Sequence, residues 1–422
     1  MLRRMLIGAG LLIAGVAAIP AVIATAQGGP PPPSSGTVLA SGLSSTGGAV
    51  GPDGAFYVAQ AGTGGPTEII FPDDIAELFG ADKGYFGFTG GVARVDPATG
   101  DVTTMTGLPS GALEPGGEGS GAADVAFMGD TMYVLITGGL NYVGGAAADY
   151  PNGIYRHDGG TSWTIVADLS AFNDANPVDF PDAAPGGNPF ALDVRGSEFI
   201  ISDGNYNRLL RATTDGEVSI LASFDNVVPT GLATRDSGPV YNTWFSAFPH
   251  PPGDSFVVTV GVPTGAVTQV ADTFAQLIDV EFGAGGTYVL QFGDQSLSEE
   301  EPPPPGRLLR LNGSELETVV TGLFLPTSVS FSGDTAFVTS LAGDLIKIDG
   351  VSALAPIEEE QAPEPTTAPA PSPTAPIGPI TPPNTGSGGM ASGGMPVALI
   401  IALAGAGLTM ASAGGLVAVR QR

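Results

Sequence analysis

The feature that most constrains the fold is a phrase that recurs six times along the chain, between two apolar ends. Each copy pairs a short apolar strand with a second apolar stretch, a turn rich in Gly and Asp, and a third apolar strand. The copies begin near Val38, Val102, Ile165, Ser219, Gln269 and Thr318. A chain that repeats one strand unit six times predicts a closed ring of β-sheets.

The period of the repeat predicts a propeller with four strands in each blade. Residues 37–351 divide into six units of about 50 residues, which is the length of such a blade. Innermost strands are expected at 124–127, 191–194 and 279–282, and second strands at 56–58, 132–134, 199–201, 288–290 and 336–338. Third strands that carry Arg or Lys are expected at 91–95, 153–156, 208–211, 307–310 and 345–348, and a fourth strand at 219–222.

The two ends of the repeat region complement each other. The last unit has no strand after 345–348, whereas the first unit is preceded by a spare strand at 38–43. We therefore predict an all-β, six-bladed β-propeller in which the N-terminal strand completes the last blade. This arrangement closes the ring and removes exposed sheet edges.

The N-terminus has the pattern of a secretory signal. Met-Leu-Arg-Arg precedes an apolar run to about Val22, and Ala24-Thr25-Ala26 has the small-x-small pattern of a cleavage site. We predict a signal peptide over residues 1–26 and a Pro-rich linker over 27–36. The alternative is an uncleaved N-terminal anchor.

The C-terminal part predicts a stalk and an anchor. Residues 352–394 are rich in Pro and lack an apolar period, so we expect a disordered stalk. Residues 395–419 are apolar and uncharged, long enough for a transmembrane helix, and 420–422 form a basic tail that should stay cytoplasmic. The predicted location is the outer face of a bacterial cytoplasmic membrane or the cell wall, with the membrane as a partner.

A short motif at the end of the stalk resembles a sortase sorting signal. Pro383, Thr385 and Gly386 match Leu-Pro-x-Thr-Gly, and an apolar helix and a basic tail follow in the family's order. Pro382 stands where that signal has leucine. The resemblance implies linkage of Thr385 to the cell envelope; a membrane protein whose linker contains the motif by chance is the other interpretation.

Composition excludes several function classes. The formal net charge is −28 and only two lysines occur, so the surface repels nucleic acid and we expect no nucleic-acid partner. The chain has no cysteine, which excludes disulfides, thiol catalysis and thiolate metal sites.

Several phrases together resemble the ScyD/ScyE family of exported bacterial proteins. They include GGEGSGAADVAF, NPFALDVRGSEFIISDGNYNRLLR and GLFLPTSVSF, and the likeness covers most of residues 37–351 in order. It implies a six-bladed propeller related to the NHL and gluconolactonase-like groups. It supplies no settled reaction and no catalytic residues.

The starts of the innermost strands face the central channel and hold the best candidate residues. The expected positions are Gly48, Asp124, Asn188, Thr230, Asp279 and Thr327. Oxygen ligands suit hard cations, so Asp124, Asn188 and Asp279 predict a Ca²⁺ site, which Glu118 could join from a nearby loop. The alternative is that both aspartates bond backbone amides at strand starts.

Other candidates are fewer. Thr230, Thr327 and Glu118 are expected to contact a ligand, and Trp244 could stack on a ring or a sugar, although a core strand plus loop is the favoured interpretation of its segment. We expect the two histidines, His157 and His250, to be surface residues. No nucleophile elbow or phosphate loop occurs.

These patterns favour a binding or interaction module, anchored at the cell surface, with an unknown surface ligand and no assigned catalytic residue. The alternative is a metal-dependent hydrolase or lactonase that uses the channel carboxylates.

Overall fold

The computed structural model describes residues 33–43, 46–117, 119–179, 183–245, 253–271, 273–293 and 305–357. The predicted signal peptide, stalk, PPNTG motif, transmembrane helix and basic tail lie outside these residues, apart from the first six residues of the stalk range. Among the described residues, none of the helices has the length and apolar character needed to span a bilayer.

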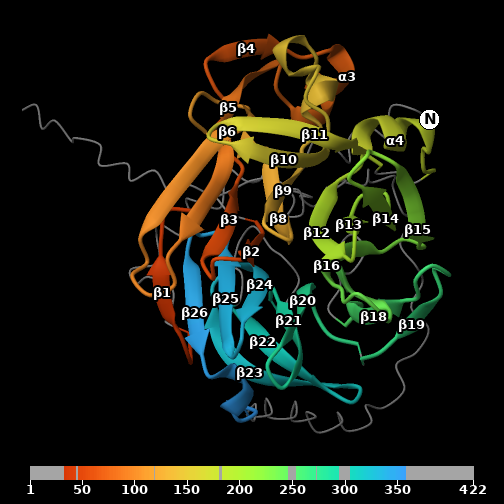
Figure 1. Ribbon diagram of the computed structural model, residues 1–422. Coiled ribbons are helices and arrows are strands. Elements are labelled where there is room, and N and C mark those ends of the chain that lie inside the picture. Colours follow the sequence, from red (N-terminus) through yellow and green to blue (C-terminus); the bar gives the residue numbers. More distant parts are fainter. Residues whose placement is uncertain are drawn as a thin grey trace, which may run out of the picture.

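Six antiparallel sheets follow one another around a ring, in chain order, as the colours show (Figure 1). This arrangement confirms the predicted six-bladed β-propeller. The innermost strands are β2 (Gly48–Val50), β8 (Ala122–Met128), β12 (Pro189–Arg195), β16 (Val228–Ala233), β20 (Leu277–Gly283) and β24 (Pro326–Ser332). The second strands are β3 (Phe56–Gln60), β9 (Thr131–Ile136), β13 (Glu198–Asp203), β17 (Val240–Phe245), β21 (Gly286–Gln291) and β25 (Thr335–Ser340).

The outer half of each blade is equally regular. The third strands are β5 (Lys83–Val95), β10 (Gly153–Gly159), β14 (Arg208–Thr213), β18 (Phe256–Val260), β22 (Gly306–Asn312) and β26 (Leu345–Asp349). The fourth strands are β6 (Val102–Ala112), β11 (Ser162–Asp168), β15 (Val218–Ser223), β19 (Val267–Gln269) and β23 (Glu315–Leu323) in blades 1 to 5, and β1 (Thr37–Ala40) in blade 6.

The N-terminal strand closes the ring, as the strand count predicts. Strand β1 pairs antiparallel with β26, so the first and last segments of the propeller lie side by side (Figure 1). Leu39 and Ala40 pack against a core cluster that contains Phe56 of blade 1 and Phe337 of blade 6. Closure therefore joins blade 6 to blade 1 through both backbone pairing and apolar contact.

Apolar clusters fill the spaces between blades. The largest one joins blade 5 to blade 6 and contains Ile278, Leu290, Val329 and Val338. Alternate residues of a strand point to opposite faces, so each blade contributes one face to each neighbour. Val289 accordingly packs toward blade 4, whereas Leu290 packs toward blade 6.

The two faces of the ring differ. Tight turns between first and second strands form one face, which we call the hairpin face; its turns are 51–55, 129–130, 196–197, 284–285 and 333–334. Connections from second to third strands, and from fourth strands to the next blade, form the opposite loop face. Long connections at 61–82, 137–152 and 169–179 lie on the loop face.

The long connections build a small structure of their own. They hold β4 (Thr67–Ile70), α3 (Asp73–Phe79), α4 (Leu169–Ala175), η3 (Leu140–Val143) and η4 (Gly145–Ala147), and the connection from β6 to β8 holds β7 (Gly119–Ser120). Ile69, Phe71, Phe86, Leu140 and Val143 form the centre of a separate apolar cluster, which we call the loop cluster. It joins blade 1 to blade 2 beyond the ends of their sheets, at the edge of the ring where β4 and α3 lie (Figure 1).

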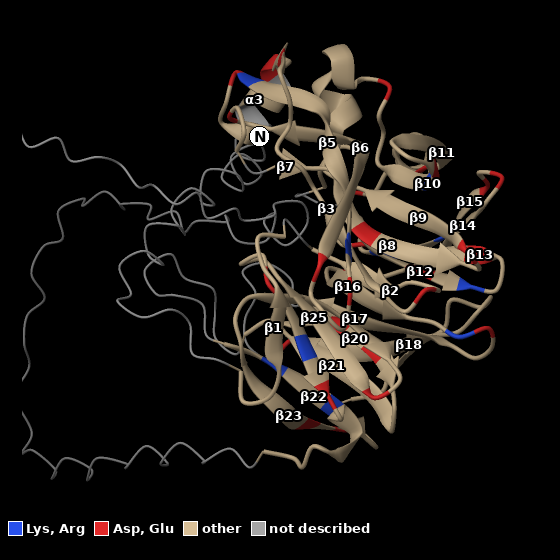
Figure 2. Ribbon diagram, turned by 60° about the vertical axis from the view of Figure 1, so that its left-hand side comes forward, with Lys and Arg blue, Asp and Glu red and all other residues tan. Residues whose placement is uncertain are grey.

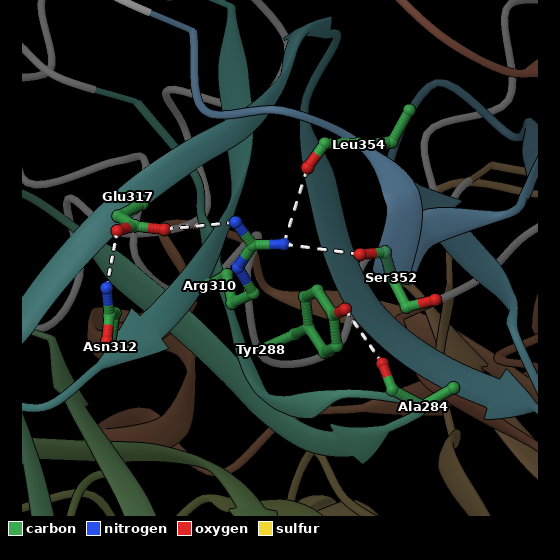
Figure 3. Close-up of polar contacts among 7 residues, drawn as sticks. All are labelled: Ala284, Tyr288, Arg310, Asn312, Glu317, Ser352 and Leu354. Atoms are coloured by element: carbon green, nitrogen blue, oxygen red, sulfur yellow. Dashed lines mark hydrogen bonds and ion pairs between the residues drawn. The ribbon is translucent and has the colours of Figure 1, made fainter.

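The C-terminal end of the propeller leaves at the hairpin face. The last element, η5 (Val351–Ala353), follows β26, and Val351 N donates to Asp334 O in the β24–β25 turn. Arg310 Nη1 donates to Leu354 O (3.3 Å) and Ser352 O (3.5 Å), while its Nη2 donates to Glu317 Oε2 (3.1 Å) (Figure 3). Residues 351–357, which we call the exit segment, are therefore held against blade 5.

Candidate functional site

Asp124 and Asp279 occupy the same position in two inner strands. Each lies opposite the penultimate residue of its neighbouring second strand, Leu135 and Leu290 respectively. Each follows a register shift that leaves one residue unpaired. The repeat therefore places two carboxylates at equivalent points of the ring, as the sequence predicts.

The predicted alignment is wrong at the other four positions. In blade 1 Gly48 lies opposite Val58 and not opposite the penultimate residue of β3. In blade 3 the residue in register with Asp124 is Ala191, so Asn188 lies three residues too early. In blade 6 that residue is Ser328, one after Thr327.

Thr230 lies in an irregular stretch where two residues are skipped between paired positions. In blades 2, 3, 5 and 6 a bulge of one residue precedes the position of Asp124, and the repeat phrase does not fix the register around this bulge.

Both aspartates accept two backbone hydrogen bonds. Asp124 Oδ1 accepts from Val125 N and its Oδ2 from Leu192 N in the next blade, both at 2.8 Å. Asp279 accepts in the same way, from Val280 N (2.9 Å) and from Val329 N in the next blade (2.8 Å). The interpretation that these carboxylates bond backbone amides is confirmed, and one of the two amides belongs to a neighbouring blade.

Two further inner-strand acids belong to the same set and were not among the predicted site residues. Asp193 accepts from Val194 N (2.7 Å) and from Thr234 N at the end of the next inner strand (2.7 Å). Glu281 accepts from Phe282 N (2.6 Å). Glu281 follows Asp279 by two residues, and this spacing on a strand was the signal that could have identified it.

Hydrogen bonds cross all six interfaces between inner strands. Three come from Asp124, Asp193 and Asp279, and the other three come from hydroxyl groups. Thr46 Oγ1 donates to Ala123 O (2.6 Å), Thr230 Oγ1 to Leu277 O (3.3 Å), and Ser330 Oγ to Gly48 O (3.0 Å). The inner strands are thus connected by side chains around the whole ring, since they share no backbone pairing.

Two glycines leave room for this arrangement. A side chain at Gly47 would collide with Asp124 Oδ1 and Ala123 O, and one at Gly231 would collide with Asp279. Because both contacts involve the carboxylates that connect blades, only a residue without Cβ fits at either position.

The acids also affect one another. Burial raises the pKa of Asp279 to about 7 and that of Asp193 to about 6, and the negative charge of Asp193 contributes to the rise at Asp279. The pKa values of Asp124 and Glu281 lie well above their usual range, first because of burial and then because of the other acids. This mutual effect means that the four side chains share one electrostatic environment. Figure 2 shows acidic positions on β8 as well as on exposed turns.

The acids do not form a compact metal cage in the described part of the chain. No group of three or more His, Cys, Asp or Glu side chains there lies close enough to hold a metal ion. Asn188 Oδ1 accepts from Thr137 Oγ1 (3.1 Å) and is not part of the Asp124–Asp279 position. Asp124, Asn188 and Asp279 as Ca²⁺ ligands therefore stay a prediction. What Asp193 and Asp279 can do is bind and release protons near neutral pH.

The predicted ligand contacts make hydrogen bonds or packing contacts of their own. Thr230 pairs with Thr243 (3.0 Å) and also donates to Leu277 O, and Thr327 pairs with Thr339 (2.9 Å). Trp244 packs between Phe224 and Phe256, with ring centroids at 4.8 and 6.4 Å. Glu118 and His250 lie outside the described residues. His157 stacks on Trp163 near the β10–β11 turn, away from the channel.

Comparison with known proteins finds solved structures that are distantly similar. The chain matches no protein-family model and no curated protein. Among solved structures it resembles a nidogen/laminin complex, at 16% identity and a TM-score of 0.43, covering 63% of this chain and 88% of that chain. It also resembles a PQQ-bound aldose sugar dehydrogenase from Streptomyces coelicolor, at 15% identity and a TM-score of 0.43, covering 75% and 98%.

A putative gluconolactonase is similar at 13% identity and a TM-score of 0.41, covering 77% of this chain and 94% of that chain. These likenesses concern the propeller fold alone, and the proteins concerned differ in what their names describe.

Proposed function

We propose that the protein is a binding module of the ScyD/ScyE type, displayed outside the cell, which uses its loop face to contact a surface ligand. The signal-like N-terminus, the Pro-rich segment and the apolar C-terminal segment support export and anchoring.

The observation that carries the proposal is that the ends of the propeller and the loop cluster lie at different parts of the ring. Strand β1 begins and strand β26 ends at the hairpin face, and the segments beyond them run along the outer strand of blade 5, where Ser34 N donates to Thr321 O and Ile357 N donates to Thr318 O. The loop cluster belongs to blades 1 and 2. A tether at blade 5 leaves the loop cluster free for a partner, which is the geometry that a displayed binding module needs.

The loop face offers apolar surface for binding. Phe88 is 48% exposed and packs edge-on against Tyr150 (5.1 Å between ring centroids), while Ile70 is 68% exposed. Exposed aromatic and aliphatic side chains beside one structured cluster are typical of contact surfaces.

The channel acids support a structural role for the centre of the ring. Asp124, Asp193 and Asp279 each use both carboxylate oxygens to hold backbone amides. Side chains engaged in this way connect blades, and the connection accounts for their burial.

The test compares matched variants of the full-length protein for retention on envelope fractions and on a glycan array. Phe88→Ser on the loop face should reduce binding at least tenfold. Val102→Ser is the control, because Val102 is equally exposed (44%) but begins β6 at the hairpin face. Equal binding by both variants and the wild type to every partner found would contradict the assignment of the loop face.

A second candidate function is a metal-dependent hydrolase or lactonase that uses the channel acids. The pKa of Asp279, raised to about 7, favours it, because a general acid or base works best near the operating pH. In this mechanism Asp279 would either exchange a proton with substrate or water in the channel or, as an ionised carboxylate, hold Ca²⁺ together with Asp124 and Asn188. The full-length protein would then turn over lactones or esters, and this activity would depend on Ca²⁺ and be lost in Asp279→Asn. That result would favour the hydrolase over the binding module.

Attachment to the envelope can be tested separately. Sortase action at Pro383, Thr385 and Gly386 would leave Thr385 as the new C-terminus, which mass spectrometry of envelope-bound protein would detect. Recovery of the intact C-terminus would indicate the membrane helix alone as the anchor.

A further inference from the structure

The dipeptide Asn-Gly occurs twice in the chain, at Asn152–Gly153 and at Asn312–Gly313. In this dipeptide the glycine nitrogen can attack Cγ of the asparagine side chain, because a glycine has no Cβ to block the approach. The Cγ–Nδ2 bond then breaks, Nδ2 leaves as ammonia with the proton of the glycine amide, and a succinimide ring remains. Water opens this ring to aspartate or isoaspartate. Since both copies have the same local chemistry, the fold decides which one reacts.

The fold holds Asn152 and Gly153 in place. Asn152 is fully buried, its Oδ1 accepts from Gly139 N (2.8 Å), and its Nδ2 donates to Gly186 O (3.2 Å). Gly153 begins β10 and pairs with a residue of β9 on one side and of β11 on the other. The nitrogen and the carbon that would react are both fixed, so blade 2 has to open before they can meet.

Asn312 and Gly313 lie instead at the tip of an exposed hairpin. Asn312 pairs with Glu315 at the end of β22 and β23, and only Gly313 and Ser314 lie between them. Gly313 has a φ of 65°, which suits the first position of a two-residue type II′ turn. Asn312, Gly313 and Ser314 are all exposed. Because one residue pair closes the turn, opening of this tip costs far less than opening of a blade.

The side chain of Asn312 belongs to the polar contacts that hold the exit segment. Its Nδ2 donates to Glu317 Oε1 (2.7 Å), and Glu317 Oε2 accepts from Arg310 Nη2 (3.1 Å) (Figure 3). The hydrogen bond from Asn312, followed by that from Arg310, lowers the pKa of Glu317. Glu317 therefore stands between Asn312 and the guanidinium that contacts Ser352 O and Leu354 O.

Deamidation would turn the first of these contacts from attractive to repulsive. An aspartate at position 312 has no side-chain N–H to donate, and its carboxylate would lie beside that of Glu317. Glu315, the strand partner of Asn312, adds a third negative charge, whereas Arg310 is the only cation among the residues of Figure 3. Isoaspartate would also insert a methylene into the backbone of the turn. Both products therefore disturb the position of Glu317 and, through it, that of Arg310.

We propose that Asn312 is a site of spontaneous deamidation, and that the charge formed there loosens the exit segment from blade 5. The reaction consumes water and needs no partner enzyme. Because the exit segment leads into the Pro-rich residues 358–394, the attachment of the propeller to the rest of the chain would weaken as the molecule ages. This site lies outside the loop cluster and does not depend on the proposed binding function.

The first experiment follows both Asn-Gly dipeptides in the full-length protein during incubation at neutral pH. Mass spectrometry of the peptides resolves the replacement of an NH₂ group by OH. In the folded protein Asn312 should deamidate about tenfold faster than Asn152 or more, since only its turn opens locally. In urea the two rates should be similar. Equal rates in the folded protein, or a faster reaction at Asn152, would overturn the site.

The second experiment measures hydrogen exchange in two matched variants of the full-length protein. Asn312→Asp reproduces the charge of the product, whereas Asn312→Gln keeps a neutral carboxamide. Asn312→Asp should speed exchange several-fold at the Val351, Ser352 and Ile357 amides, which donate to Asp334 and Thr318. Asn312→Gln should exchange as the wild type does, and deamidated wild type should match Asn312→Asp. Unchanged exchange in Asn312→Asp, or equal acceleration in both variants, would overturn the effect on the exit segment.

Discussion

The aspartates of the inner strands show how one residue can join two blades. A carboxylate on a short side chain accepts from its own strand with one oxygen and from the next strand with the other, as Asp279 does with Val280 and Val329. The two amides offset part of the cost of burial, and they lower the pKa that desolvation raises. The same chemistry recurs at Asp124 and Asp193.

We predict that Asp279→Ala lowers the free energy of unfolding by roughly 2–4 kcal/mol. The substitution leaves two buried backbone N–H groups without an acceptor, each costing about 1–2 kcal/mol. Urea unfolding at pH 6 measures the effect. Asp130→Ala, in an exposed turn, is the control and should stay within about 0.5 kcal/mol of the wild type. Equal stability of both variants would show that the inter-blade bonds contribute nothing.

At the scale of elements, the ends of the propeller are fastened to blades 5 and 6. Strand β1 completes blade 6, and Ser34 N donates to Thr321 O (2.9 Å) on the outer strand of blade 5. Ile357 N donates to Thr318 O (2.8 Å) on the same strand. The segments on both sides of the propeller thus cover the edge of β23, which would otherwise expose unpaired backbone groups.

Closure of the ring depends on the side of β1 that faces the core. Leu39 packs against the cluster that contains Phe56 and Phe337, whereas Val38 is 52% exposed. We predict that Leu39→Ser lowers the free energy of unfolding by roughly 1–2 kcal/mol, because it removes apolar burial from the closing strand. Val38→Ser, one residue away, should have little effect in the same denaturation assay. A larger loss for Val38→Ser would contradict this orientation.

The exit segment depends on the guanidinium of Arg310, which contacts Ser352, Leu354 and Glu317 together (Figure 3). We predict that Arg310→Lys speeds hydrogen exchange of the Val351, Ser352 and Leu354 amides several-fold, since an ammonium lacks the planar fork needed for these contacts.

Arg94→Lys is the matched control for the exit segment. Arg94 stands on the third strand of blade 1 and pairs with Asp53 (2.7 Å), whereas the contacts of the exit segment are with blades 5 and 6. Its substitution should leave exchange at 351–357 unchanged, and equal acceleration in both variants would point to a general loss of stability instead.

For the whole molecule, six blades without shared backbone pairing behave as one ring because side chains and apolar clusters connect them. The same ring concentrates four acids, Asp124, Asp193, Asp279 and Glu281, in one electrostatic environment. Their repulsion acts against the inter-blade bonds that three of them make. The balance depends on how many of them carry a charge, and hence on pH.

We predict that stability falls as the pH rises from about 4 to 8. The folded-state pKa values of Asp193 (about 6) and Asp279 (about 7) lie above the roughly 3.9 of an unfolded aspartate, so the folded protein binds more protons. This contribution is fully present below about pH 4 and is lost through pH 6–7. Urea unfolding at pH 5 and pH 8 should differ by on the order of 2–4 kcal/mol.

The double variant Asp193→Asn/Asp279→Asn should flatten this dependence, because it removes the two titrating groups while keeping their shapes. A slope as steep as that of the wild type would assign the pH dependence to other groups, such as Asp203, whose pKa burial also raises.

The sequence by itself determined the number of blades, the order of the strands and the closure by β1. These follow from a strand repeat and from a count of strands at its two ends, which are local patterns. It also identified Asp124 and Asp279, because each begins the same apolar phrase. The sequence left two roles open for these acids, and the structure shows the one in which they bond backbone amides.

Only the tertiary structure decided which residues meet. Asn188 lies before the one-residue bulge of its strand and Thr327 lies within such a bulge, while a longer irregularity displaces Thr230. Asp193 and Glu281 join the acids because the ring brings separate blades to one axis. Asp193 accepts from Thr234 N only when two blades pack side by side, and hydrogen bonds between distant segments leave no trace in a local pattern.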